Sequence, residues 1–522
     1  MSGCRVDDKD IHQWENTANG PKKLCAVLLY DKYDTDLRVE SALALIRMKP
    51  RSGRRLAFTQ IDGEEPPEHA QCKGTLIDVL AALPADDRAA IVGQLVPAIV
   101  LELKKPPPVS QPGQVAAADG SFPFKDAAYA MMTPEADRAG IIADEGLKQA
   151  LRGALVEWAM ADFEHRLDNR SQSYGMEQVL RAIGKDAVVG LPSLMTKDAR
   201  KLDAMASLVA ELGDPATKEK ASAALVKIAE WITSEDWLKL RTPDLRERYA
   251  AQKQSPNEQQ FKDQLTQEQE DDLLKVFASM RKVGGRPVVD YALAFAARKD
   301  QSDKRRQAAL AAVEKQLDPK KPEDVKRILE IASSDAPDIV LDQAFRRIGE
   351  LPREQVADKL YDLFKTDKWK VRRAAATTVL KMSTVKHIDE FLSKLPEEKN
   401  FALGEALTYG AYLGELKEGT PLDELKKHFT TGSPSARASA IAWYYTYGTS
   451  ADVPAVASLE SDTSPAPSCD TDPDCKWSCE VAKEGSQERE QREIKSIGDF
   501  VRLCVTPAMR DRKPEAGKDE KK

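Results

Sequence analysis

The 522-residue sequence has few aromatic side chains and little net charge. Phe, Trp and Tyr make up 6% of the chain, and the formal net charge is −7 with acidic and basic residues mixed throughout. A nucleic-acid-binding protein usually carries a basic face or stripe, and none stands out in this sequence. We therefore expect no nucleic-acid partner.

Long apolar runs are also missing. The longest runs from Ile91 to Leu103 and is interrupted by Gly93, Gln94, Pro97 and Glu102. A helix that crosses a bilayer needs about 20 predominantly apolar residues. No transmembrane helix is expected.

The motifs of common enzymes and nucleotide-binding proteins do not occur either. The chain has no G-x-x-x-x-G-K-[ST] phosphate loop, no G-x-G-x-x-G turn and no G-x-S-x-G nucleophile elbow. We expect no enzymatic activity, no cofactor and no metal, while a Ser/His/Asp triad assembled only in the fold stays open.

What the sequence does contain is a helical pattern that recurs in its C-terminal half. In residues 367–382 small and apolar side chains recur at i, i+3, i+4, i+7, i+8 and i+11, which is one face of an α-helix. The opposite face carries Lys370, Arg373 and Lys381 and is predicted to face solvent. Equivalent i, i+4, i+8 triads, with last members 31, 32 and 33 residues apart, are Val340/Ala344/Ile348, Val371/Ala375/Val379, Leu403/Leu407/Ala411 and Ala436/Ala440/Tyr444. A period in the low thirties made of two helices predicts an α-solenoid.

Two stretches resemble the second helix of a HEAT repeat, where an Asp is followed by an Arg and an Ala-rich apolar stripe. The matching residues are Asp34, Arg38 and Ala42, and then Asp367, Val371, Arg372, Ala374, Ala375 and Leu380. The resemblance implies an all-α, HEAT-like α-α superhelix (solenoid) of antiparallel helix pairs. It also implies that the Asp caps the inner helix and that the Arg ties neighbouring repeats together. Some HEAT-repeat enzymes hold a di-iron centre with His-Glu pairs, but no histidine in this chain is directly followed by Glu.

Composition divides the chain into eight predicted segments. They are a lipobox remnant (1–4), N-terminal HEAT-like repeats (5–103), a Pro-rich linker or loop (104–124), central HEAT-like helices (125–232), an irregular polar helical segment (233–286), regular HEAT-like repeats (287–457), a Cys-rich C-terminal cap (458–509) and a disordered charged tail (510–522). Within them, Thr266 and Gln269 predict a capping box that opens a helix. Residues 488–505 are predicted to form one more helix.

The seven cysteines suggest one lipidated residue and a set of disulfides. Ser2, Gly3 and Cys4 resemble the end of a bacterial lipobox, whose Cys becomes lipidated. The even remainder, which is Cys25, Cys72, Cys469, Cys475, Cys479 and Cys504, predicts three disulfides, as in oxidising compartments. We expect Cys25 to pair with Cys72, and the other four to pair among themselves in one of three connectivities. A four-thiolate zinc site is the alternative for these four, but their spacing fits structural zinc poorly.

Aromatic residues offer one further candidate site. Trp443, Tyr444, Tyr445 and Tyr447 form the densest aromatic stretch, and they either anchor a peptide or glycan in a groove or thicken the core of the last regular repeat. The core interpretation is favoured. Trp369 is likewise predicted to pack between adjacent helix corners.

Together these features predict a non-enzymatic scaffold that binds protein partners along the concave surface of the solenoid. Cys4 would anchor it to a bacterial envelope membrane, facing the periplasm or the cell surface. One alternative is a cytosolic helical-repeat adaptor in which Cys4 is incidental, and another is a HEAT-like enzyme such as a lyase.

Overall fold

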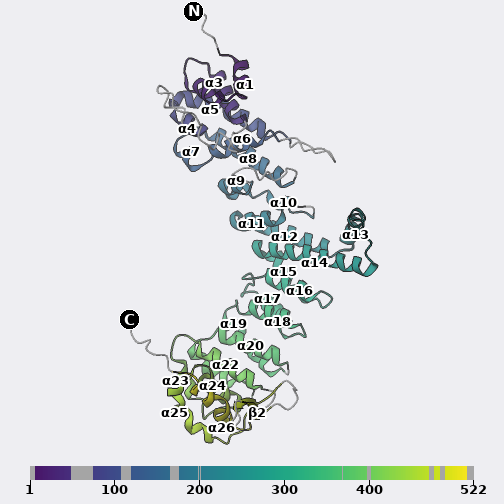
Figure 1. Ribbon diagram of the computed structural model, residues 1–522, viewed down its shortest axis with the longest axis vertical. Coiled ribbons are helices and arrows are strands. Elements are labelled where there is room, and N and C mark those ends of the chain that lie inside the picture. The colour runs from purple at the N-terminus through teal and green to yellow at the C-terminus, as the bar shows by residue number, and fades with distance from the viewer. Residues whose placement is uncertain are drawn as a thin grey trace, which may run out of the picture. The chain divides into compact units, whose positions relative to one another are not determined.

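The computed structural model describes residues 6–48, 74–106, 119–164, 176–197, 199, 201–366, 368–396, 401–468, 475–482 and 488–513. The chain forms two compact units, residues 1–288 and 289–522. Each unit is built of HEAT-like antiparallel helix pairs, so the predicted all-α solenoid fold is confirmed (Figure 1). None of the helices in the described part is both long and apolar enough to cross a bilayer.

The described part of the first unit consists of helices and a short 3-10 turn. Its elements are α1 (Asp8–Trp14), α2 (Gly20–Leu29), α3 (Thr35–Arg47), α4 (Leu76–Ala82), α5 (Ala85–Leu103), α6 (Phe122–Met131), α7 (Pro134–Arg138), α8 (Glu145–Glu164), α9 (Met176–Ile183), η2 (Lys185–Ala187), α10 (Leu191–Leu194), α11 (Leu202–Leu212), α12 (Pro215–Ile232), α13 (Glu235–Ala251) and α14 (Glu258–Val283). Helix α15 (Arg286–Ala296) begins in this unit and continues into the next. The predicted linker, residues 104–124, begins directly after α5 ends at Leu103, but its last three residues belong to α6, which begins at Phe122.

The start of α3 follows the HEAT-like pattern. Asp34 is its N-cap, and the Asp34 carboxylate accepts a hydrogen bond from the Leu37 N–H at 2.9 Å. This bond satisfies one of the first-turn N–H groups that have no partner within the helix. The equivalent prediction for Asp367 falls on a residue outside the described part, and the N-cap of α20 is Lys368.

The polar region after α12 is more regular than predicted. It forms two long helices, α13 and α14, and the capping box of α14 is made by Asn257 and Gln260. The predicted capping box at Thr266 is wrong, because Thr266 lies inside α14 and its hydroxyl donates to the Lys262 carbonyl at 2.9 Å. The same kind of box occurs nine residues earlier in the sequence, directly after Pro256, and that earlier copy starts the helix.

The second unit continues the helix pairs and ends in a small mixed cap. Its helices are α16 (Asp303–Ala312), α17 (Pro322–Ser333), α18 (Asp338–Ile348), α19 (Arg353–Asp362), η3 (Leu363–Lys365), α20 (Trp369–Lys381), η4 (Val385–His387), α21 (Ile388–Ser393), α22 (Leu403–Gly414), α23 (Pro421–Lys426), α24 (Pro434–Tyr447), η5 (Ser450–Asp452), α25 (Val453–Val456) and η6 (Ala457–Ser461). The cap adds β1 (Ser478–Ala482), β2 (Arg489–Glu493), α26 (Ile497–Phe500), the π-helix η7 (Val501–Val505) and α27 (Thr506–Arg510). Helices α16, α18, α20, α22 and α24 pack against one another in that order.

The four predicted core triads lie on α18, α20, α22 and α24, and one of them is displaced. On α18, α20 and α24 the predicted residues are buried. On α22, however, Leu407 and Ala411 are only half-buried, and the equivalent buried positions are Glu405, Tyr409 and Leu413. Hydropathy pointed to the wrong residues because two members of the true triad are polar.

Helices α22 and α24 approach closely at Gly410. A methyl group added to Gly410 would meet the Ala442 carbonyl carbon at 2.6 Å and the Ala442 Cβ at 2.7 Å. Only a glycine on one helix and a small residue on the other allow this approach.

The C-terminal cap differs from the single predicted helix. Residues 489–493 form a strand that pairs antiparallel with β1, from Ser478 opposite Glu493 to Ala482 opposite Arg489. The predicted helix over residues 488–505 is therefore wrong for residues 489–493. This charged segment has no strand pattern of its own, and it forms a strand only because it pairs with β1. The predicted disorder from Arg510 onwards is also wrong for residues 510–513. The Arg512 guanidinium donates to the Gly448 carbonyl at 2.8 Å and the Tyr445 carbonyl at 2.6 Å, which ties it to the end of α24.

Candidate functional site

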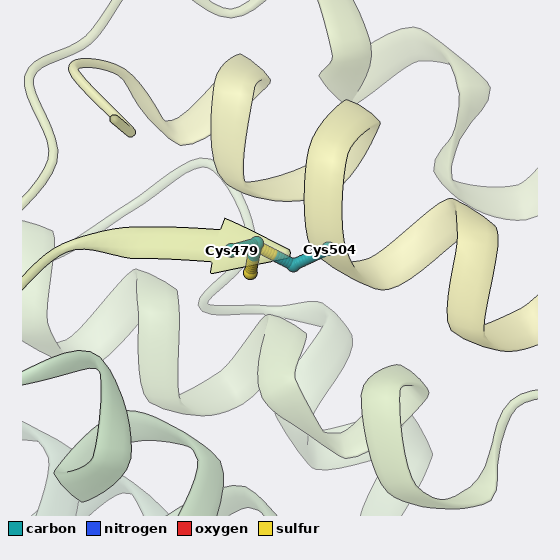
Figure 2. The surroundings of a disulfide bond; sticks show 2 residues. All are labelled: Cys479 and Cys504. Carbon is teal, nitrogen blue, oxygen red and sulfur yellow. A yellow bond between two sulfur atoms is a disulfide. The ribbon is translucent and has the colours of Figure 1, made fainter. Parts of the chain in front are cut away.

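The cysteines predicted to matter are only partly within the described residues. Cys4, Cys72 and Cys469 lie outside that part of the chain. Cys479 on β1 and Cys504 in η7 form a disulfide with a Cα–Cα distance of 5.8 Å, and Figure 2 shows how it ties the strand to the helix. Cys25 and Cys475 are also disulfide-bonded. The complete set of three disulfides and the lipidation of Cys4 stay predictions.

A buried tryptophan anchors this cap to the helix pairs. The Trp477 indole N–H donates to the Phe401 carbonyl at 2.6 Å, and its ring meets Phe500 edge to face at a centroid distance of 5.7 Å. The Leu403 N–H donates to the Lys476 carbonyl at 3.3 Å, at the first residue of α22. The cap therefore covers the start of α22 and is a structural element.

Buried arginines link successive helix pairs, as the resemblance implied. Arg38 donates to the Leu28 carbonyl at 2.9 Å and to Asp87 of α5 at 3.1 Å. Arg372 donates through Nε and Nη2 to the two carboxylate oxygens of Glu405 on α22, each at 2.9 Å. Both arginines stand four residues after the N-cap, and both act structurally.

A pocket of about 320 Å³ lies on the helices α18, α20 and α22. Each helix presents residues about one turn apart to it, and the lining residues are Asp338, Leu341, Asp342, Trp369, Lys370, Arg373, Ala374, Thr377, Thr408 and Tyr412. Neighbouring helices in one layer lie about 8–10 Å apart. We call the surface formed by these ten residues the groove.

Two of the four charged residues in the groove pair with each other, and the other two, one helical turn farther along, do not. Lys370 of α20 donates to Asp338 of α18 at 2.6 Å. One turn farther along the same two helices, Asp342 and Arg373 are both exposed. Among the described residues, neither Asp342 nor Arg373 makes an ion pair or a side-chain hydrogen bond. The groove therefore presents one carboxylate and one guanidinium that are free to bind other groups.

Hydroxyl groups and aromatic rings complete the groove. The Thr377 and Thr408 hydroxyls donate to carbonyls of their own helices, at 3.1 and 2.6 Å, which leaves their oxygens as acceptors toward the groove. Trp369 and Tyr412 are half-exposed. Trp369 is among the residues that line the groove, and its packing between adjacent helix corners stays a prediction. Lysines lie over both rings, with Lys370 5.9 Å from the Trp369 centroid and Lys381 5.5 Å from the Tyr412 centroid.

In the aromatic stretch on α24, Tyr444 belongs to the core, as favoured from the sequence, whereas Trp443, Tyr445 and Tyr447 are half-buried. Tyr444 is buried and contacts Trp443 edge to face at 5.1 Å. The Tyr447 hydroxyl donates to the Ala411 carbonyl of α22 at 2.8 Å. These residues hold α24 to α22 and do not line the groove.

One cluster in the first unit resembles a metal site in composition. His12, Glu15 and Glu40 place their ligand atoms within 4.8 Å of one another. Arg47 already donates to both carboxylates, each at 2.5 Å. Burial lowers the pKa of Arg47, but the hydrogen bonds to Glu15 and Glu40 outweigh it and raise the pKa above its usual value. A structural ion-pair network therefore accounts for this cluster.

Sequence reasoning missed the groove because its charged residues occupy the helix face that was assigned to solvent. Arg373 and Lys370 had been placed there, and Asp342, Thr408 and Tyr412 had no signal of their own. The sequence did contain one indication of the groove. Polar and aromatic residues recur at i and i+4 on each of the three helices α18, α20 and α22.

Comparisons with known proteins add little. No protein-family model matches the chain, and no curated protein matches it. Two crystal structures of the karyopherin Kap121p, bound to the SUMO protease Ulp1p and to the extreme C-terminus of the protein phosphatase Cdc14p, are each 10% identical over 87% of this chain, with TM-scores of 0.31 and 0.32. The chain spans 43% and 44% of the length of those karyopherin chains. A crystal structure of SYS-1 is 11% identical, covers 80% of this chain and 86% of its own, and has a TM-score of 0.25. Likenesses this weak support no inference about partner or activity.

Proposed function

We propose that the protein is a non-enzymatic helical-repeat scaffold that binds an extended segment of a partner protein in the groove on α18, α20 and α22. The observation that carries the proposal is the pair of unpaired opposite charges, Asp342 and Arg373, beside two half-exposed aromatic rings. Rigid aromatic side chains and arginine are the residues that contribute most to protein interfaces.

The dimensions of the groove suit a peptide. Three adjacent helices about 8–10 Å apart span roughly 20 Å. An extended chain advances about 3.3 Å per residue, so about six residues would cross the three helices. The Thr377 and Thr408 oxygens can accept hydrogen bonds from the backbone N–H groups of such a segment.

We further propose that Cys4 is lipidated and anchors the scaffold to a bacterial envelope membrane, facing the periplasm or the cell surface. The lipobox-like residues Ser2, Gly3 and Cys4 support this proposal. The Cys479–Cys504 disulfide fits an oxidising compartment. The alternative is a cytosolic adaptor with the same groove.

Site-specific photo-crosslinking in the natural host tests the groove. A photo-reactive amino acid in place of Thr377 should crosslink a partner, and a second substitution, Trp369→Ala, should abolish that crosslink. The matched control places the same amino acid at Lys359, an exposed residue of α19 that does not line the groove. Equal crosslinking from both positions, or crosslinking that does not depend on Trp369, would contradict the proposal.

Cell fractionation tests the anchor separately. Cys4→Ser should move the protein from the membrane fraction to the soluble fraction without unfolding it, because the acyl chains hold it at the bilayer. Retention of this variant in the membrane fraction would refute the lipid anchor and leave the groove proposal intact.

A further inference from the structure

We infer that the segment bound in the groove is zwitterionic, with a basic side chain that pairs with Asp342 and an acidic side chain that pairs with Arg373. The inference rests on the proposed function and specifies the chemistry of the partner. It follows from how the groove distributes its four charges.

The ten lining residues carry two carboxylates and two cations, so their charges balance, and Lys381, which lies over the Tyr412 ring, is not one of them. Lys370 and Asp338 neutralise each other at 2.6 Å. What remains is Asp342 on α18 and Arg373 on α20, which line the same pocket from two neighbouring helices. A polybasic segment would meet Arg373, and a polyacidic segment or a nucleic acid would meet Asp342. Either would gain one ion pair and suffer one repulsion.

Two apolar lining residues favour charge pairing in the pocket. Leu341, next to Asp342 on α18, is buried, and Ala374, next to Arg373 on α20, is half-buried. A bound segment would exclude water from these apolar side chains, and charges attract more strongly when water is excluded. Arg373 can in addition hold a carboxylate through two parallel N–H donors.

The spacing of the two charges in the partner follows from extended-chain geometry. In a β-like segment, side chains i and i+2 point to the same side and lie roughly 7 Å apart. A single pocket of about 320 Å³ can receive two such side chains from one segment. We therefore expect a basic and an acidic residue separated by one residue.

Selection from a library of random dodecapeptides against the immobilised full-length chain tests the inference. Selected peptides should be enriched in a basic and an acidic residue two positions apart, and their affinity should fall at least tenfold for Asp342→Lys and for Arg373→Glu. Replacing the basic residue of a selected peptide with Glu should restore binding to Asp342→Lys. Replacing its acidic residue with Lys should restore binding to Arg373→Glu.

Three controls separate the possible failures. Lys359→Glu, a charge reversal of an exposed lysine outside the groove, should leave the affinity unchanged, and far-ultraviolet circular dichroism should show that each variant is folded. Two outcomes would overturn the zwitterionic inference and leave the groove proposal standing. In the first, the selected peptides lose binding with Trp369→Ala but contain no pair of opposite charges. In the second, Asp342→Lys and Arg373→Glu leave the affinity of such peptides unchanged. Failure to select any peptide whose binding depends on Trp369 would overturn both.

Discussion

The ion pair between Arg372 and Glu405 should stabilise the contact between α20 and α22 strongly. Both side chains are buried, with 4% and 2% of their surfaces exposed. Glu405 accepts two hydrogen bonds from Arg372 at 2.9 Å, one from the Ala402 N–H at 3.0 Å and one from the Tyr409 hydroxyl at 3.1 Å. Desolvation by burial and the nearby Glu405 charge raise the pKa of Tyr409 well above its usual value, so its hydroxyl remains a donor.

Arg372→Met removes the cation and leaves the buried Glu405 carboxylate without charge compensation. Breaking a buried pair in this way costs about 3–5 kcal/mol. In the double variant Arg372→Met/Glu405→Gln the buried charge is gone, and the amide oxygen can still accept one of the two remaining hydrogen bonds. The double variant should therefore recover about 1–3 kcal/mol of the loss.

Hydrogen exchange followed by mass spectrometry measures the loss of stability in α20 and α22 locally. A local measurement is needed because the two compact units need not unfold in one step. A loss of 3–5 kcal/mol lowers the protection of amides in α20 and α22 by about two to almost four orders of magnitude, at 1.36 kcal/mol per tenfold change. The control is Arg373→Met, the neighbouring exposed arginine without an ion pair, which should change stability by less than about 0.5 kcal/mol. Equal protection in wild type and Arg372→Met would refute the reasoning.

Three further predictions concern the second unit. Gly410→Ala should lower stability by about 1–3 kcal/mol, because the new methyl group meets the backbone of α24. Loss of the disulfide in Cys479→Ser/Cys504→Ser should lower the protection of η7 by the equivalent of about 3 kcal/mol, since the bridge closes a 25-residue separation. His387 has a pKa below its usual 6.5, owing first to burial and then to nearby Arg353. The free energy of unfolding should therefore decrease as the pH falls from 7 to 5.

Each of these has a matched control. Gly404→Ala changes a glycine in the same helix whose added methyl group meets nothing within 4 Å, and it should not destabilise the protein. The sign for His387 follows from linkage, because the unfolded state binds the proton more readily than the folded state. His387→Asn keeps an acceptor for the Thr384 N–H, now 3.0 Å from His387 Nδ1, and should flatten the pH dependence. Each prediction has an outcome that would contradict it. For His387→Asn it is an unchanged dependence of stability on pH, and for Gly410→Ala it is an unchanged stability. For the disulfide it is equal protection of the η7 amides in wild type and in Cys479→Ser/Cys504→Ser.

The repeat period and the apolar side of the helices could be predicted from the sequence. Residues such as Val371, Ala375 and Val379 report their burial directly, because their hydropathy and their helical spacing agree. On α22 the same method failed, since Glu405 is buried only through its pairing with Arg372 of the previous repeat. A contact of that kind depends on two distant segments and is not visible within either.

The strand and the groove were beyond the sequence for a related reason. Arg489–Glu493 becomes a strand only because β1 pairs with it. Asp342 and Arg373 look like ordinary solvated charges on two separate helices. Their shared pocket arises only when α18 and α20 are stacked.

The central claim is that the groove binds an extended protein segment, and hydroxyl-radical footprinting of the full-length chain tests it most directly. With a selected peptide bound, oxidation of Trp369 and Tyr412 should fall, whereas oxidation of Trp231, a half-exposed tryptophan of the first unit, should stay unchanged. Unaltered oxidation of Trp369 and Tyr412 at saturating peptide would contradict the account.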